Sequence, residues 1–369
     1  MDVTPGSPPA DLPAGHPRHA RSPVLAVDSG GSGIRVALTP VRGAGPALTW
    51  SSPDPAVMGA RGIDAHSLLD RVLPAAARLL REAGAERCEA VCVGASGMAT
   101  LGDDLRAVLP DALRDALGAR RLALASDAVT AYAGALGQRP GAVVAVGTGL
   151  VALGTDLTPE GGWRRADGWG HLLGDCGSGA WIGRAGLEAA MRAYDGREEG
   201  ASPALLARLE ALFGPAPELP GKLYPRADRP ALLASFAPEV GRCAGTDPVA
   251  ARILREAARH IAGAAAAVCP RPDRDSRRTQ STHPAQPTYP PQPARPDERA
   301  LPVALTGGLL RMGEPLLTPL HRELQLQLPQ ARLITAAGDP LGGASLVAAA
   351  LATDTLRLPT EAGLLRIIC

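Results

Sequence analysis

Short apolar runs alternate with longer amphipathic segments along this chain. The run Val24–Val27 shows no alternation of polar and apolar residues, which is typical of a strand buried on both faces. Similar runs predict strands at 34–39, 91–94, 122–125, 142–146 and 303–305. Helical periodicity predicts helices at 65–83, 103–117, 128–136, 184–194, 203–213, 248–268 and 338–352. Strands and helices in this alternation indicate an α/β fold with helices layered on sheets.

The same pattern divides the chain of 369 residues into two lobes, which is the size of two ordinary domains. We expect an N-terminal lobe at 23–137 and a C-terminal lobe at 138–352, with tails at 1–22 and 353–369. Residues 270–300 are dense in Pro, Arg, Gln and Thr and lack hydrophobic periodicity. They are predicted to form a disordered insertion that protrudes from the second lobe.

Three glycine-rich turns each follow an apolar strand. They contain Gly30, Gly31, Ser32 and Gly33 in the first, Gly147, Thr148 and Gly149 in the second, and Gly307 and Gly308 in the third. Glycine lets backbone N–H groups approach a polyanion closely, although one such turn alone could equally be a tight hairpin. Three of them, with acids shortly before the first two, predict a nucleotide held between two lobes.

Two acidic residues mark the strand ends beside these turns. Asp28 begins the first turn, and we expect it to hold Mg²⁺ through water, since Mg²⁺ gives up its hydration reluctantly. Asp127 follows the strand at 122–125, where it could cap a helix or act as a general base for an attacking hydroxyl. Both roles are compatible at one position.

The run from Gly168 to Gly179 is unusually rich in glycine. Such density packs poorly but permits close approach to a ligand. Asp175 could accept hydrogen bonds from sugar hydroxyls, and Trp169 could shape the pocket. The alternative is a flexible loop that ends in a helix N-cap at Ser178.

Composition excludes several functions. A net charge of +1 and an aromatic content of 3% argue against nucleic-acid or membrane partners. The one lysine, Lys222, lies in no phosphate-loop motif, so backbone amides, hydroxyls and a metal ion must hold any ATP phosphates. Six scattered cysteines and the lack of an apolar leader predict a reduced, cytoplasmic compartment.

Taken together, these motifs resemble the N-acetylglucosamine kinase branch of the BadF/BadG/BcrA/BcrD ATPase family, within the sugar kinase/Hsp70/actin superfamily. The resemblance rests on five segments: 28–33, 126–128, 147–149, 168–179 and 306–309. The Gly-Trp-Gly-His…Gly-Asp-x-Gly-Ser run is the most specific part of the resemblance. The resemblance as a whole implies two ribonuclease-H-like, actin-like lobes that close over ATP, Mg²⁺ and a sugar.

The resemblance also implies residue roles. Asp127 matches the catalytic base that activates the sugar 6-hydroxyl, and Gly168, Trp169, Gly170 and Asp175 match sugar-binding positions. Ser32 and Thr148 match ATP-contacting positions, with Gly30, Gly31, Gly33, Gly147 and Gly149 in the same phosphate turns and Gly307 and Gly308 in the adenosine turn.

The chain departs from the family pattern at three positions. Asp54, in Pro53-Asp54-Pro55, replaces a sugar-contacting asparagine, which favours either an amino sugar or a different acceptor. Cys176 replaces a glutamate, and Leu150 follows the second turn where serine is usual. The resemblance thus implies a kinase acting on N-acetylglucosamine or glucosamine, with a homodimer left open.

Two other functions stay open. One is an ATPase that drives electron transfer through an iron–sulfur cluster shared by two subunits, with Cys176 and Cys243 as candidate ligands. The other is a regulator that binds a sugar without phosphorylating it. Such regulators often add a DNA-binding helix-turn-helix, for which residues 1–22 are too short.

Overall fold

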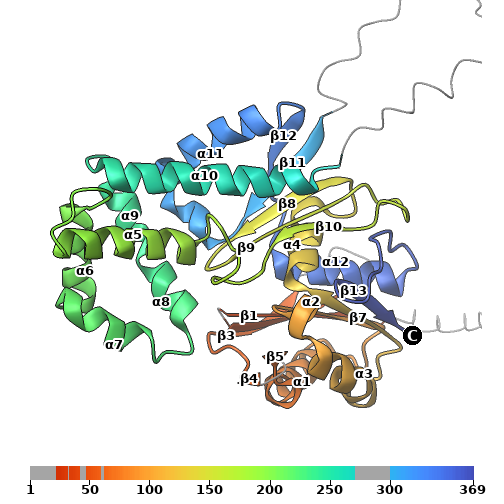
Figure 1. Cartoon of the computed structure of the whole chain (residues 1–369). Helices are drawn as coiled ribbons and strands as arrows, with labels where there is room; N and C mark the ends of the chain where they lie inside the picture. The colour runs from red at the N-terminus through yellow and green to blue at the C-terminus, as the bar shows by residue number, and fades with distance from the viewer. Residues whose placement is uncertain (1–21, 32, 42–46, 60–61, 271–299) are drawn as a thin grey trace, which may run out of the picture.

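Two mixed sheets and the helices around them form two lobes in the computed structural model (Figure 1), which describes residues 22–31, 33–41, 47–59, 62–270 and 300–369. The expected tail at 1–22 and the expected insertion at 270–300 lie almost wholly outside the described residues. The α/β prediction is confirmed, with helices layered on both sheets.

The first sheet has the strand order β13-β7-β6-β1-β2-β3. Its strands are β1 (Val24–Gly30), β2 (Gly33–Thr39), β3 (Leu48–Ser52), β6 (Ala90–Ala95), β7 (Arg121–Ser126) and β13 (Leu365–Ile368). β1 pairs antiparallel with β2 and parallel with β6, and β6 pairs parallel with β7. A short ribbon of β4 (Met58–Gly59) and β5 (Gly62–Ile63) lies beside this sheet.

The second sheet has the order β10-β9-β8-β11-β12. Its strands are β8 (Gly141–Val146), β9 (Leu150–Thr155), β10 (Arg164–Asp167), β11 (Leu301–Thr306) and β12 (Ala331–Thr335). β8 pairs antiparallel with β9 and parallel with β11, so β8 has the same surroundings here as β1 has in the first sheet. The two lobes therefore repeat one topology, with a glycine turn in the equivalent hairpin of each.

Helices cover the outer faces of both sheets. The first lobe carries α1 (Ala65–Glu82), α2 (Met98–Leu101) and α3 (Asp103–Leu117). The second carries α5 (Gly179–Tyr194), α6 (Pro203–Phe213), α7 (Leu219–Leu223), α8 (Arg229–Ser235), α9 (Ala237–Cys243), α10 (Pro248–Val268) and α11 (Glu314–Gln327), with short 3-10 turns at Ala216–Glu218 and Gly308–Met312. Apolar side chains of these helices pack on the sheets in two separate cores.

A third core joins the lobes around α4 (Asp127–Leu136) and α12 (Pro340–Ala352), which lie between the two sheets (Figure 1). It contains Val24 and Ala26 from the first sheet and Val143 and Leu153 from the second. α4 packs against strands of both sheets, and α12 packs against α4 and the first sheet. The pair therefore helps to set how the two lobes are placed relative to each other.

The two central helices approach closely at glycines. A Cβ on Gly343 of α12 would lie 1.9 Å from the carbonyl oxygen of Thr130 in α4, and one on Gly134 would lie 2.1 Å from the carbonyl oxygen of Asp339. Both clashes are with backbone atoms, which cannot swing aside as a side chain can. The crossing therefore requires glycine on each helix.

We expect Gly343→Ala to lower the free energy of unfolding by about 1–3 kcal/mol, because overpacking forces the two backbones apart. Gly342→Ala is the matched control, since a Cβ there lies 3.4 Å from its nearest neighbour, the Asp339 side chain. Urea unfolding of both variants measures the difference. Equal stabilities of the two variants would show that the crossing tolerates a methyl group.

Most predicted elements are found near their expected positions, and the clearest difference is at the C-terminus. Residues 365–368 form β13, antiparallel to β7 in the first sheet, so 353–369 is wrong as a simple tail. No helices were predicted between 216 and 243, where the structure has a 3-10 turn and helices α7, α8 and α9.

Within the described residues, no helix is both long and apolar enough to cross a membrane.

Candidate active site

The carboxyl ends of the parallel strands bring the candidate residues to corresponding edges of the two sheets. Asp28 lies near the end of β1, and Asp127 comes directly after β7, two strands away in the same sheet. In the second sheet, Gly147 follows β8, and Gly307 follows the neighbouring strand β11. Ligands of open α/β sheets bind outside this edge, where parallel strands end.

The first two glycine turns present glycines to open space. A Cβ on Gly30, Gly31 or Gly147 would have no neighbour within 4 Å among the residues that the structure describes. This is the geometry of a cradle that a bulky anion can enter. Ser32, the expected hydroxyl donor of the first turn, lies outside the described residues.

The second turn is fastened to the start of α5. The carbonyl oxygens of Gly147 and Thr148 accept the N–H groups of Gly179 and Ala180 at 2.8 and 3.0 Å. The third turn packs against the end of β8. Gly307 has φ +108°, and a Cβ on it would lie 2.2 Å from the Val146 carbonyl oxygen. The second and third turns therefore lie close together beside the start of α5.

Asp28 lies in an ion-paired network rather than in a ready-made metal cage. Arg35 donates to its Oδ2 from Nε and Nη2 at 3.0 and 2.6 Å, and also bonds Asp339, the N-cap of α12. Burial raises the pKa of Asp28, and the Arg35 contacts oppose that shift. The described residues contain no group of three or more acids, histidines or cysteines placed to hold a metal. This donor set fits an ion held chiefly by phosphate oxygens and water, with Asp28 as an outer ligand.

Asp127 occupies the first turn of α4, and Ser126 is the N-cap, so the simple capping interpretation of Asp127 is wrong. Its Oδ1 accepts the N–H of Ala128 at 2.9 Å. Burial raises the pKa of the Asp127 carboxyl to about 6, and the charge of Asp28 adds to this, while Arg165 of the second lobe acts against it. No cationic side chain among the described residues bonds it directly, so it remains available as a base.

The glycine-rich run is organised by the carboxylate of Asp167, which was not among the predicted site residues. Asp167 accepts backbone N–H groups of Gly168 at 3.0 Å, of Cys176 at 3.2 Å, and of Asp175. The backbone of Asp167 and of Asp175 has a positive φ, 61° and 54°, a conformation that residues other than glycine adopt rarely. Asp167 therefore closes the ends of the 167–176 loop onto each other.

The loop brings one of its predicted sugar-binding residues, Asp175, against the second glycine turn. Asp175 accepts the N–H of Gly170 at 3.3 Å and abuts Gly149, where a Cβ would lie 2.6 Å from its Oδ2. Burial raises the pKa of Asp175, and nearby Asp167 adds to the rise. Trp169 is 60% exposed, with the Arg165 guanidinium 4.7 Å from its ring centre. Arg165 thus contacts the 167–176 loop and acts electrostatically on Asp127.

Asp54 is a candidate site residue that lies on the surface. Its side chain is 74% exposed and lies 3.7 Å from Arg71 of α1. It follows β3, whose end lies against Gly33 of the first turn. The structure brings this residue to the correct edge but shows no contact between Asp54 and Asp127 or Asp175.

The two candidate cluster ligands are placed differently. Cys243 is buried in the core of the second lobe, and Cys176 is half-buried in the 167–176 loop. A cluster on a dimer axis requires thiols that face a partner. Cys243 does not meet that requirement in this conformation.

Three further residues belong to the site and were not predicted: Arg35, Arg165 and Asp167. Arg35 could have been found from the hairpin, because it pairs with Asp28 across the first glycine turn. The Asp-Gly step at Asp167 is a turn signal that was available in the sequence. Arg165 carries no local signal.

Comparison with known proteins identifies the class to which this fold and site belong. Residues 25–281 match the BadF/BadG/BcrA/BcrD ATPase family, which is more than half of the chain. The chain therefore belongs to that family of ATPases, which includes sugar-kinase-like members.

Individual relatives are consistent with the kinase branch. The chain is 35% identical over 114 residues to an N-acetylmuramic acid/N-acetylglucosamine kinase of Clostridium acetobutylicum, a match that covers 31% of this chain and 36% of that relative. A Chromobacterium violaceum structure, solved under the provisional description of an N-acetylglucosamine kinase, is similar at 28% identity and a TM-score of 0.62, over 89% and 99% of the chains. A hexokinase from Thermus thermophilus shares the fold, at 20% identity and a TM-score of 0.50 over 88% and 97%.

Proposed function

We propose that this chain is an ATP-dependent kinase that phosphorylates O6 of N-acetylglucosamine or glucosamine. The observation that carries the proposal is Asp127, a carboxylate with a pKa raised to about 6, placed at the carboxyl end of β7 between the two lobes. A general base works best when its pKa lies close to the operating pH. Family membership and the C. acetobutylicum relative support the choice of reaction and substrate.

The proposed roles follow from the contacts above. The turns at Gly30–Gly33, Gly147–Gly149 and Gly307–Gly308 hold the nucleotide through backbone N–H groups. Bound Mg²⁺ would neutralise charge on the phosphates, with Asp28 as its outer ligand. The loop at 168–175 holds the sugar hydroxyls. Asp127 accepts the proton of the sugar 6-hydroxyl as that oxygen bonds to phosphorus, and ADP leaves.

The test is ADP release from Mg-ATP across a panel of acceptors. We expect release that depends on N-acetylglucosamine or glucosamine, with N-acetylmuramate, N-acetylmannosamine, glucose and no sugar as comparisons. Phosphorus and carbon NMR of the product locates the phosphate on O6. The Asp127→Asn variant controls for contaminating kinases.

The other outcomes separate the alternative functions. Release that ignores every sugar would contradict the kinase and favour the electron-transfer ATPase. Sugar binding without any release would favour a regulator. Dependence on N-acetylmuramate alone would keep the reaction but correct the acceptor.

A further inference from the structure

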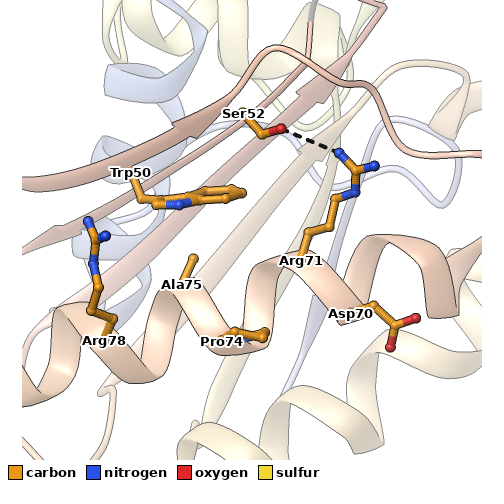
Figure 2. A pocket seen from close by; sticks show the side chains of 7 residues that line it. All are labelled: Trp50, Ser52, Asp70, Arg71, Pro74, Ala75 and Arg78. Atoms are coloured by element: carbon orange, nitrogen blue, oxygen red, sulfur yellow. Dashed lines mark hydrogen bonds between the residues drawn. The ribbon is translucent and has the colours of Figure 1, made fainter.

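A groove on the outer edge of the first lobe is not used by the proposed reaction. It has a volume of about 420 Å³ and lies between the edge strand β3 and helix α1. Its lining consists of Trp50, Ser52, Asp70, Arg71, Pro74, Ala75 and Arg78. Figure 2 shows Trp50 and Ser52 on the strand facing Arg71, Ala75 and Arg78 on the helix, with the Asp70 carboxylate turned away from Trp50. The volume falls within the range of small-molecule sites.

One arginine of the groove, Arg78, is available to an anion. Arg71 and Arg78 are two helical turns apart on one side of α1, so their Cα atoms are separated by about 10 Å along the helix axis. Arg78 makes no hydrogen bond or ion pair among the described residues. Asp70 is the only acid in the lining. A guanidinium without a partner beside a concave surface is well suited to form bidentate hydrogen bonds with a phosphate or carboxylate group.

The second arginine is already oriented. Arg71 donates from Nη1 to Ser52 Oγ at 3.3 Å and to the Asp54 carbonyl oxygen at 3.0 Å, which holds its side chain against the end of β3. Its Nη1 also lies 3.7 Å from the Asp54 carboxylate, and its side chain is 34% exposed. A ligand that bonds Arg71 would therefore meet a group whose position is largely fixed, with little entropy left to lose.

The remaining wall is apolar and aromatic. The indole of Trp50 is half-buried and forms the strand side, and Pro74 and Ala75 form the helix side (Figure 2). An indole offers a large flat surface to the C–H faces of a sugar ring, while the Ser52 hydroxyl can bond a sugar hydroxyl. A ring platform next to guanidinium groups describes a ligand with a hydroxylated ring and an anionic substituent.

We propose that this groove is a second binding site, for a hexopyranose that carries a phosphate or carboxylate group. The ring packs on Trp50, and the anionic group bonds Arg78, with Arg71 as the further donor. The proposal goes beyond the proposed kinase function and does not depend on it, because binding here uses none of the residues assigned to catalysis.

Fluorine NMR of the full chain labelled with 5-fluorotryptophan tests the proposal. Trp50 is assigned from the Trp50→Phe variant, and the chain is titrated with N-acetylglucosamine 6-phosphate, N-acetylmuramate, N-acetylglucosamine, AMP and inorganic phosphate. We expect the Trp50 resonance to shift saturably with an anionic sugar. Binding at the proposed active site would instead move Trp169 of the 167–176 loop, so the two sites report separately.

Variants then identify the anion donors. Arg78→Ala should weaken the titration seen at Trp50 by about tenfold or more, since hydrogen bonds between charged groups are lost. Arg81→Ala, an exposed arginine on the same helix outside the groove, should leave it unchanged. A Trp50 resonance unmoved by every anionic sugar overturns the proposal. Equal affinity for N-acetylglucosamine, AMP or inorganic phosphate also overturns it, because the site would then not select an anionic sugar.

Discussion

Asp127→Asn is expected to lower turnover by about 10²–10⁴-fold, the range that general base catalysis contributes. An asparagine at this position keeps the hydrogen bond from Ala128 but cannot accept the proton of the attacking hydroxyl. ATP affinity should change little, because the phosphate turns and Arg35 do not bond Asp127. Sugar-dependent ADP release and calorimetric titration with ATP measure the two quantities.

The pH dependence of the wild-type enzyme gives the same prediction a second readout. Since the pKa of Asp127 is raised to about 6, the base is charged at neutral pH and becomes protonated as the pH falls through about 6. kcat/KM should fall over that interval, whereas an aspartate with an ordinary pKa near 3.8 would lose activity about two pH units lower. The residual activity of Asp127→Asn should lack this limb.

An exposed aspartate on the surface of the first lobe supplies the control. Asp115→Asn, in α3, removes an equal charge outside the site and should keep both turnover and the pH profile. Wild-type turnover in Asp127→Asn would remove Asp127 from the role of base. An acid limb near pH 4 in the wild type would contradict the raised pKa.

The parts of the fold that follow from local signals could be predicted from the sequence. α6 and α10 occupy the expected residues 203–213 and 248–268, because Ser202 and Asp247 cap their first turns and proline fills the first helical position of each. The strands at Val24–Val27 and 142–146 are found because a strand buried on both faces is continuously apolar.

Features that depend on contacts between distant segments could not be predicted. Arg35 pairs with Asp28 across one hairpin, but its second partner, Asp339, is 304 residues away. β13 joins the first sheet only because the chain returns there after α12. Neither arrangement has a signal in neighbouring residues.

The candidate site also contains some residues that the sequence reveals and others that only the folded chain reveals. The glycine turns and Asp127 are visible as motifs, since each lies at the end of a strand. Asp167 was missed, because an acid in a turn is ordinarily solvated and its partners, Asp175 and Cys176, are brought back to it only by the folded loop. The residue that shapes the 167–176 loop is therefore a finding of the structure.

Asp167→Asn is expected to raise the KM for the sugar by about 10- to 100-fold, with a smaller effect on kcat and none on the KM for ATP. The amide keeps one acceptor oxygen, but its NH₂ group would face a backbone N–H of Gly168, Asp175 or Cys176, where both groups are donors. Loss of a hydrogen bond to a charged group costs about 1.5–3 kcal/mol, which corresponds to the stated range. Steady-state kinetics with each substrate varied in turn measures the change.

Asp156→Asn is the matched control, because Asp156 holds an equivalent turn outside the site by accepting the N–H and hydroxyl of Thr158 at 2.9 and 2.8 Å. That variant should keep the wild-type KM for the sugar. If Asp167→Asn and Asp156→Asn behave alike, the loop does not depend on the Asp167 carboxylate. If Asp167→Asn instead raises the KM for ATP and for the sugar equally, the carboxylate supports the whole second lobe. Only a selective effect on the sugar makes Asp167 the residue that positions Asp175 and its neighbours for binding.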